Sequence, residues 1–212
     1  MKYIFLDFNG TVLDDVDLCI NLLNEMLVWK GHKPVSYSEY KEIFQFPVIE
    51  YYKKAGFDFK GYTFEELADV FIVEYTRRNN HECKIFSDFT KFVDLLHANG
   101  FTIVLCSASK LNLLIDQLNE FNIIQYFDDV IGLDNHHATS KLELAKEYVS
   151  KHKIDLGNSY FIGDTTHDAE VGRALGVKVV LVERGHQSYQ VLSKATDNVV
   201  RSLLEAYELI CK

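Results

Sequence analysis

The sequence opens with MKYIFLDFNGTVLDD (residues 1–15), which places the carboxylate of Asp7 inside an otherwise apolar segment. Residues 3–8 form a short, mostly apolar segment that is followed by Asn9 and Gly10. This pattern predicts a buried strand ending in a turn. A charge near the end of a buried strand calls for a chemical explanation. The amide of Asn9, two residues further on, raises a second question, namely why no acid stands there.

The chain then changes to helical periodicity. Residues 15–31 (DVDLCINLLNEMLVWKG) carry apolar side chains at helical spacing and end in glycine, a common helix stop. SYSE at 36–39 and TFEE at 63–66 both match the capping box with which many helices begin. We therefore predict three or four packed helices, without strands, between residues 15 and 81.

From residue 82 onward, strand-like and helix-like segments alternate. The helical segments are amphipathic and about 10–15 residues long, and the main predicted strands between them are FTIVLC (101–106), DDVIGL (128–133), SYFIG (159–163) and VKVVLV (177–182). This alternation predicts an α/β fold with a doubly wound, Rossmann-like parallel sheet covered by helices on both faces. We expect residues 1–14 and 82–212 to form this core, and residues 15–81 to form an inserted all-α cap domain.

Composition narrows the classes of partner. The chain has 212 residues, 48% of them hydrophobic, which is enough for one substantial core with a small second domain. Its net charge of -9 disfavours binding to nucleic acid or to anionic membranes. The four cysteines form no C-x-x-C pair, and no apolar run approaches the ~20 residues of a membrane span. We expect a cytoplasmic protein, present as a monomer or a small homo-oligomer.

The chemically useful residues follow the predicted strands. In open α/β sheets, ligands bind beyond the carboxyl ends of the strands, so residues at these ends should share one crevice. Asp7 ends the first strand, Ser107 follows the strand 101–106, and Asp164 follows the strand 159–163. Asp168 then lies on the first turn of a helix, and Lys141 begins another helix.

Such a cluster of acids predicts a metal-dependent reaction on phosphate. Neighbouring carboxylates repel one another unless a cation lies among them, and oxygen ligands of this kind suit Mg²⁺. Three aspartates would be balanced by Mg²⁺ and Lys141, so a phosphate group can enter an otherwise acidic protein. A carboxylate such as Asp7 can attack phosphorus, while Ser107, Lys141 and backbone N–H groups stabilise the transferring phosphoryl group.

Four motifs, DFNGT, CSAS, Lys141 and GDTTHD, resemble those of the haloacid dehalogenase superfamily in order and spacing. The helical insertion resembles the cap of the phosphoglycolate-phosphatase-like branch. The resemblance implies that Asp7 is the nucleophile, that Asp164 and Asp168 are acids of the magnesium site, and that the backbone carbonyl of Asn9 is a further ligand. The phosphate-binding residues expected at these motifs are Gly10, Thr11, Ser107, Ala108 and Lys141.

The sequence departs from this family at two positions. Lys141 is followed by Leu142, where the branch usually has proline. More important, phosphatases of the family carry an aspartate at the position of Asn9, where it protonates the leaving alcohol and later deprotonates the attacking water. Asparagine has nearly the same shape and can donate a hydrogen bond, but it cannot transfer a proton at neutral pH.

Each residue also has a purely structural interpretation. Asn9-Gly10 is a favoured turn, Ser107 fits a helix N-cap, Lys141 fits a solvated helix lysine, and Asp168 favours its helix N-terminus. Two further sets have less specific roles: the histidines are expected to be solvated loop or surface residues, and the aromatic side chains to form cap core or to line the pocket. These are His136, His137 and His167 in the first set and Phe44, Phe46, Tyr51 and Tyr52 in the second.

Three functions remain open at this stage. The leading hypothesis is a Mg²⁺-dependent phosphatase that acts on a small phosphorylated metabolite, slowly because of Asn9. A phosphonatase would need a Schiff-base lysine in the cap, for which Lys53 and Lys54 are candidates. The third is a catalytically impaired relative that binds a phosphorylated metabolite or a partner protein. A dehalogenase is disfavoured, because metal-free halide displacement has no use for the pair of Asp164 and Asp168.

Overall fold

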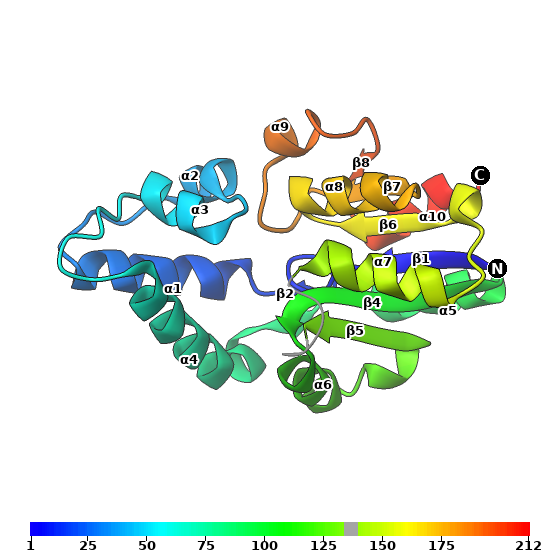
Figure 1. The fold of residues 1–212 in the computed structure, drawn as a ribbon, viewed down its shortest axis with the longest axis horizontal. Coiled ribbons are helices and arrows are strands. Elements are labelled where there is room, and N and C mark those ends of the chain that lie inside the picture. Colours follow the sequence, from blue (N-terminus) through cyan, green and yellow to red (C-terminus); the bar gives the residue numbers. More distant parts are fainter. Residues whose placement is uncertain (134–139) are drawn as a thin grey trace.

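A computed structural model describes residues 1–133 and 140–212 of the chain. Its centre is a six-stranded, fully parallel sheet in the order β5-β4-β1-β6-β7-β8 (Figure 1). The strands are β1 (Lys2–Leu6), β4 (Phe101–Lys110), β5 (Asp129–Leu133), β6 (Tyr160–Gly163), β7 (Lys178–Val182) and β8 (Val199–Val200). The predicted doubly wound α/β core is therefore confirmed, with the first strand at its centre.

Alternation along the strands gives the sheet two buried faces. In β1, Ile4 and Leu6 pack on one side with helices α5 (Phe89–Ala98), α6 (Leu111–Glu120) and α10 (Leu203–Ile210). Tyr3 and Phe5 pack on the other side with α7 (Lys141–Lys151) and α8 (Thr166–Leu175). Side chains of successive strand residues point to opposite faces, so a nearly continuous apolar run serves both layers. A further short helix of the core, α9 (Tyr189–Leu192), lies between β7 and β8 in the chain.

Four helices lie beside the sheet, at its carboxyl edge (Figure 1). They are α1 (Val16–Trp29), α2 (Tyr37–Ile43), α3 (Val48–Ala55) and α4 (Phe64–Glu82). Both predicted capping boxes are present, Ser36 with Glu39 at the start of α2 and Thr63 with Glu66 at the start of α4. These helices bury an aromatic-rich apolar cluster of their own. We call residues 15–81 the helical cap; its boundaries as a separate domain stay a prediction.

Two short strands that the sequence did not predict connect the cap to the core. β2 (Leu13–Asp14) pairs antiparallel with β3 (Lys84–Ile85), so the segments entering and leaving the cap lie side by side. β4 also runs four residues further than predicted, through Ser107 to Lys110, with an irregular register beyond Cys106. This longer strand changes the surroundings of Ser107, as described below.

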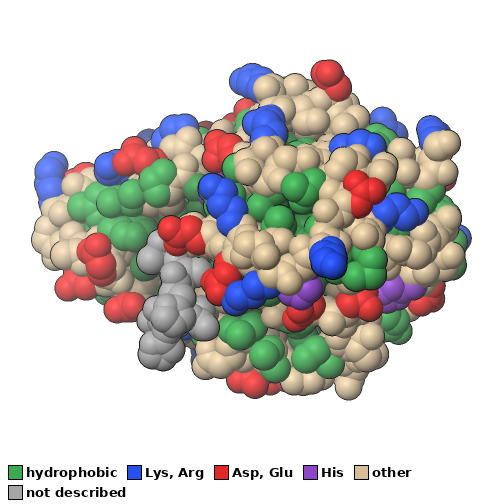
Figure 2. All heavy atoms as spheres, turned by 45° about the vertical axis from the view of Figure 1, so that its right-hand side comes forward, with side chains coloured by type: hydrophobic (Ala, Val, Ile, Leu, Met, Phe, Trp, Pro, Cys, Tyr) green, Lys and Arg blue, Asp and Glu red, His purple; other side chains and the backbone are tan. Residues whose placement is uncertain are grey.

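The surface carries both signs of charge. On the face drawn in Figure 2, acidic and basic side chains are interspersed, and the basic ones do not gather into one continuous patch. Among the described residues, none of the helices is both long enough and apolar enough to cross a membrane.

Candidate active site

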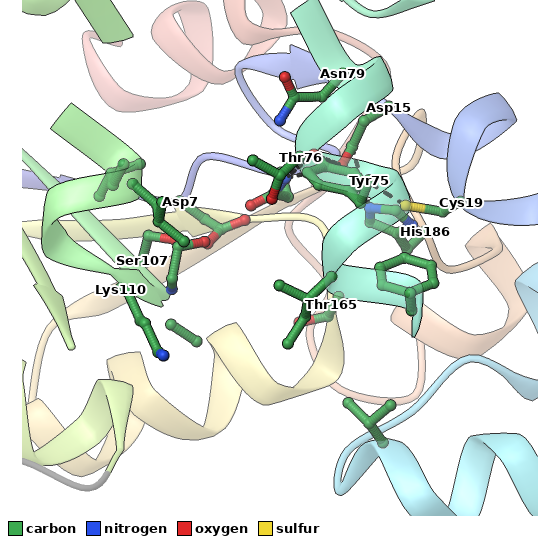
Figure 3. Close-up of a pocket in the computed structure, with 18 of the residues that line it drawn as sticks. Asp7, Asp15, Cys19, Tyr75, Thr76, Asn79, Ser107, Lys110, Thr165 and His186 are labelled. Atoms are coloured by element: carbon green, nitrogen blue, oxygen red, sulfur yellow. Dashed lines mark hydrogen bonds and ion pairs between the residues drawn. The ribbon is translucent and has the colours of Figure 1, made fainter. Parts of the chain in front are cut away.

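The carboxyl ends of the central strands bring together the acids predicted from the sequence. Asp7 follows β1, Asp164 follows β6, and Asp168 lies in the first turn of α8. One carboxylate oxygen from each of the three lies within 4.8 Å of the others, and all three side chains are buried. Ser107, on β4, is buried at the same edge and lies on the Asp7 side of the pocket in Figure 3.

Lys141 ties two of these acids together. It is the first residue of α7, which Ser140 caps by accepting a hydrogen bond from the Glu143 N–H. Its ammonium donates to Asp7 Oδ1 and, at 2.6 Å, to Asp168 Oδ1. The side chain is only 5% exposed, so the interpretation of Lys141 as a solvated helix lysine is wrong. Burial alone would lower the pKa of Lys141, but the two carboxylates raise it above its usual range.

Asp168 has both a structural and an electrostatic role. Its Oδ2 accepts hydrogen bonds from the backbone N–H of Thr165 at 3.0 Å and from the Thr165 hydroxyl at 2.6 Å, which completes a capping box at the start of α8. Burial would raise the pKa of Asp168, but Lys141 outweighs burial and lowers it. Asp168 is therefore an anion that fixes the position of the lysine.

Asp7 and Asp164 are in a different electrostatic state. Burial is the main cause that raises the pKa of Asp7 to about 8, against the opposing effect of Lys141. Burial also raises the pKa of Asp164 to about 6, although the His186 charge opposes this. Asp164 accepts hydrogen bonds from the His186 backbone N–H at 2.6 Å and from the Thr11 hydroxyl at 3.3 Å. A cation among these acids would favour their ionised forms.

The donor set fits a hard divalent cation. Mg²⁺ prefers oxygen ligands and is bound through a few carboxylates together with water and substrate phosphate. Asp7, Asp164 and Asp168 offer carboxylate oxygens close together, and the backbone of Asn9 lies two residues after Asp7 in the chain. A bound Mg²⁺ would supply Lewis-acid stabilisation of phosphoryl oxygens. The assignment of these four residues as metal ligands stays a prediction.

The predicted phosphate-binding residues have mixed surroundings. Ser107 is not a helix N-cap, because β4 continues past it and α6 has Lys110 at its N-cap; its Oγ instead accepts the Ser109 N–H at 3.1 Å. The Thr11 hydroxyl lies 3.4 Å from Asp7 Oδ2. The Gly10 N–H donates to Asp15 Oδ1 at 2.9 Å. Ala108 is exposed and lines the pocket, so it and Ser107 face the space where a phosphate would bind.

The Asn9 side chain is held by two residues that the sequence did not single out. Its Nδ2 donates to Asp15 Oδ2 at 2.8 Å and to the Tyr75 hydroxyl at 2.7 Å. The Tyr75 hydroxyl in turn donates to Asp15 Oδ2 at 2.6 Å. Asp15 is 1% exposed, and its pKa is lowered, because the charge and hydrogen bond of His186 outweigh burial. An ionised acid therefore lies beside the amide, where the amide can donate to it and a second carboxylate would be repelled.

His186 completes this group on the far side of Asp15. Its Nε2 lies 3.3 Å from Asp15 Oδ1, and its Nδ1 lies 2.8 Å from the Tyr40 hydroxyl of the cap. Burial would lower the pKa of His186, but Asp15 outweighs it and raises that pKa to about 9. The ring also stacks on Phe44 of the cap, with ring centroids 4.7 Å apart. In Figure 3, Asp15, Tyr75 and His186 lie on one side of the pocket and Asp7 and Ser107 on the other.

One of these missed residues had a signal in the sequence. His186 follows the predicted strand 177–182, and the strand-end argument that selected Asp7 and Asp164 applies to it equally. Tyr75 had no such signal, because it is one of several aromatic residues on an amphipathic helix. His136 and His137 lie outside the described residues. His167 is partly buried and packs against Phe46, with ring centroids 4.9 Å apart.

A cavity of about 680 Å³ separates the acids from the cap. The core contributes Asp7, Ser107, Lys141 and Asp164 to its lining. Phe44, Phe46, Tyr51 and Tyr52 also line it, and Tyr51 and Tyr52 are buried in the cap cluster as well. The two interpretations offered for these aromatic residues are therefore compatible, because the core of the cap is also the roof of the pocket.

Comparisons with known proteins agree with this architecture. The family described as haloacid dehalogenase-like hydrolase matches residues 3–182. A phosphoglycolate phosphatase of Caulobacter vibrioides is 24% identical over 204 residues, covering 94% of this chain and 86% of that protein.

Two solved structures have the same fold. A haloacid dehalogenase-like hydrolase from Streptococcus pneumoniae superposes with a TM-score of 0.82 at 16% identity, covering 99% of this chain and 98% of the other. A putative phosphoglycolate phosphatase from Lactobacillus delbrueckii superposes with a TM-score of 0.81 at 19% identity, with the same coverage.

Proposed function

Because the chain belongs to the haloacid dehalogenase-like hydrolase family, we propose that it hydrolyses the phosphate ester of a small metabolite through an aspartyl-phosphate on Asp7, with Mg²⁺ as cofactor. The phosphatases among its relatives support the coarser part of this statement, that it is a phosphoric monoester hydrolase. The observation that carries the finer part is the position of Asp7. Its buried carboxylate adjoins two further acids and is held by Lys141 at the floor of a capped cavity.

Each side chain at the site has a separate role in phosphoryl transfer. Asp7 attacks phosphorus, and the Asp7–P bond forms as the bond to the leaving oxygen breaks. Lys141, held by Asp168, stabilises negative charge on the phosphoryl oxygens, and Ser107 can donate its hydroxyl hydrogen to them. The cap lines the cavity together with these residues, which favours small substrates over phosphoproteins.

Asn9 limits the rate of this scheme. It cannot protonate the leaving oxygen, nor can it take a proton from the water that hydrolyses the aspartyl-phosphate. A positioned acid or base is typically worth about 10²–10⁴ in rate. We therefore propose a slow enzyme whose second step is the slower one for substrates with good leaving groups.

The same observation favours one alternative, a protein that binds a phosphorylated ligand or a partner without turnover. A phosphonatase is less well supported. Lys53 pairs with Glu50 at 2.7 Å and Lys54 with Gln45 at 2.7 Å, and neither lysine lines the cavity.

A trapping experiment separates turnover from binding alone. Wild-type protein and Asp7→Asn are mixed with Mg²⁺ and a panel of phosphate monoesters, quenched in acid and examined by peptide mass spectrometry. The proposal expects one added phosphoryl group on the peptide containing residue 7 in the wild type, and neither adduct nor product with Asp7→Asn. Turnover by Asp7→Asn at the wild-type rate contradicts the mechanism, and wild-type binding of phosphate without adduct or product supports the binding alternative.

A further inference from the structure

The cavity roof has an unusual chemistry for an enzyme whose substrate carries charge. The cap contributes mainly aromatic and aliphatic side chains to it, including Phe44, Phe46, Tyr51, Phe64, Phe71 and Tyr75. Among the described lining residues, the only Lys and Arg side chains are Lys110 and Lys141. Both come from the core, and Lys141 is already paired with Asp7 and Asp168. The cap wall therefore offers no guanidinium or ammonium to a leaving group.

The buried polar groups that α4 of the cap and α6 of the core contribute to the lining also disfavour an anion. Asn79 and Gln117 are buried, and the Asn79 Oδ1 and the Gln117 Nε2 have no hydrogen-bond partner among the described residues. These are neutral groups, one acceptor and one donor, and both residues line the cavity (Asn79 is labelled in Figure 3). The charged side chains that α6 contributes to the lining, Asp116 and Glu120, are negative. A carboxylate on a leaving group packed against the cap would therefore lose its hydration there without gaining an ammonium or guanidinium partner.

Size leads to the same conclusion. A volume of about 680 Å³ lies well within the range of sites that enclose drug-sized ligands. A two-carbon acid such as glycolate would leave most of this space without contacts, whereas a ring can pack against the aromatic side chains of the roof.

Asn9 adds an independent constraint on the same group. Both hydrogens of its amide are directed at protein acceptors, Asp15 and the Tyr75 hydroxyl. The leaving oxygen therefore departs with its electron pair and without a proton from residue 9. Phenols, with a pKa near 10, leave as phenolates far more readily than alkanols leave as alkoxides.

We infer that the substrate is an aryl phosphate monoester with an uncharged aromatic leaving group, an inference that rests on the proposed phosphatase function. Asp7 attacks phosphorus, the P–O bond to the ring oxygen breaks, and the phenolate leaves with the electron pair. Water then hydrolyses the aspartyl-phosphate, so that aryl phosphate and water yield a phenol and inorganic phosphate. The ring occupies the aromatic roof, and the phosphoryl group lies at Asp7.

Three phosphate esters test the two constraints separately. Benzyl phosphate matches phenyl phosphate in ring and charge but has an alkanol leaving group. 4-Carboxyphenyl phosphate keeps an aryl leaving group, with a slightly more acidic phenol, but adds a carboxylate. In single-turnover experiments with Mg²⁺, we expect the wild type to release phenol at least about 10²-fold faster than benzyl alcohol. We also expect kcat/KM for phenyl phosphate to exceed that for 4-carboxyphenyl phosphate by at least about tenfold.

A matched pair of variants tests whether the cavity wall causes the preference for phenyl phosphate over 4-carboxyphenyl phosphate. Ile72 and Val73 are neighbours on α4, with relative exposures of 51% and 63%, but only Ile72 lines the cavity. Ile72→Lys should lower the preference for phenyl over 4-carboxyphenyl phosphate by about fivefold, the size of one partly exposed ion pair. Val73→Lys should leave that preference unchanged.

The outcomes distinguish failure of the proposed phosphatase function from failure of the aryl-substrate inference. If the wild type hydrolyses none of these esters and no other phosphate monoester, the proposed function itself fails. If it hydrolyses 2-phosphoglycolate or 4-carboxyphenyl phosphate as well as phenyl phosphate, the phosphatase stands and the aryl inference is overturned. If Ile72→Lys and Val73→Lys change the preference for phenyl over 4-carboxyphenyl phosphate equally, the cavity wall does not cause that preference, and the inference is likewise overturned.

Discussion

Replacing Asn9 with aspartate should turn a slow enzyme into a faster one, and the structure explains how the new acid would be protonated. The amide nitrogen of Asn9 lies 2.8 Å from Asp15 Oδ2. A carboxylate in its place would put two unit charges about 3 Å apart, which costs roughly 5 kcal/mol at an effective dielectric constant of about 20. Because His186 stabilises the ionised form of Asp15, the introduced residue takes up a proton instead. It then resembles the acid that family phosphatases use.

The expected gain is large enough to measure in two ways. A general acid and base is worth about 10²–10⁴ in rate, so steady-state turnover of Asn9→Asp should rise by about 10²-fold or more. With an aryl phosphate, the wild type should release a burst of phenol followed by slow turnover, because the aspartyl-phosphate accumulates. The burst should be absent in Asn9→Asp. Stopped-flow absorbance with 4-nitrophenyl phosphate and Mg²⁺ measures the burst and the steady state together.

Two variants control for the neighbouring charge. Adding Asp15→Asn to Asn9→Asp removes the carboxylate that keeps the new acid protonated, so the gain in rate should move to lower pH. Asp14→Asn removes an exposed carboxylate next to Asp15 and should leave the profile in place. Fresh protein is needed, because Asn-Gly deamidates readily and an aged sample would acquire the same aspartate; mass spectrometry of the peptide covering residue 9 detects this. If fresh wild-type protein hydrolyses benzyl phosphate as fast as Asn9→Asp does, another group supplies the proton and the reasoning fails.

Three further predictions concern charge at the site. Lys141→Met leaves two buried carboxylates without their partner and should lower the free energy of unfolding by about 3–5 kcal/mol. The control Lys53→Met, at an exposed lysine, should change the free energy of unfolding by no more than about 0.5 kcal/mol. Urea denaturation compares the two variants, and equal effects would show that the buried ion pairs are unimportant. Asp164→Asn should weaken Mg²⁺ binding, measured by calorimetry, together with turnover, and activity that survives EDTA would exclude the magnesium mechanism. Asp15 raises the folded-state pKa of His186 to about 9, against the effect of burial. In metal-free protein, the contribution of His186 to stability is therefore complete below about pH 6.5 and is lost as the pH rises through about 9. The free energy of unfolding of the wild type should therefore decline over this pH range, and that of His186→Gln should decline less. If the two free energies decline in parallel, the ion pair between His186 and Asp15 is not the cause.

The fold was predictable because its main determinants are local. Apolar runs of strand length alternate with amphipathic helices after residue 82, and the capping boxes at Ser36 and Thr63 fix the starts of two cap helices. The two-residue strands β2 and β3 carry too few residues for any periodicity, so their pairing could not be read from the sequence.

The candidate site was predictable where it depends on topology. Parallel strands end at one edge, which is enough to bring Asp7, Ser107 and Asp164 together. The contacts around Asn9 depend instead on how the cap packs against the core. Tyr75 reaches Asp15 from α4, across 60 residues of sequence, and no spacing rule predicts such a contact.

The antiparallel pair of β2 and β3 determines how freely the length of the segment between them can vary. Leu13 pairs with Ile85 and Asp14 with Lys84, so the cap begins and ends at one point of the core. In polymer terms the cap is a closed loop whose ends already meet, and doubling the length of such a loop adds only about 0.6 kcal/mol of closure entropy. The core therefore places little restriction on the size of what is inserted there. Exchanging the segment between the two strands would alter the cavity wall, but it would also remove Asp15 and Tyr75, which hold the Asn9 side chain. An exchange that preserves the site therefore has to keep these two residues.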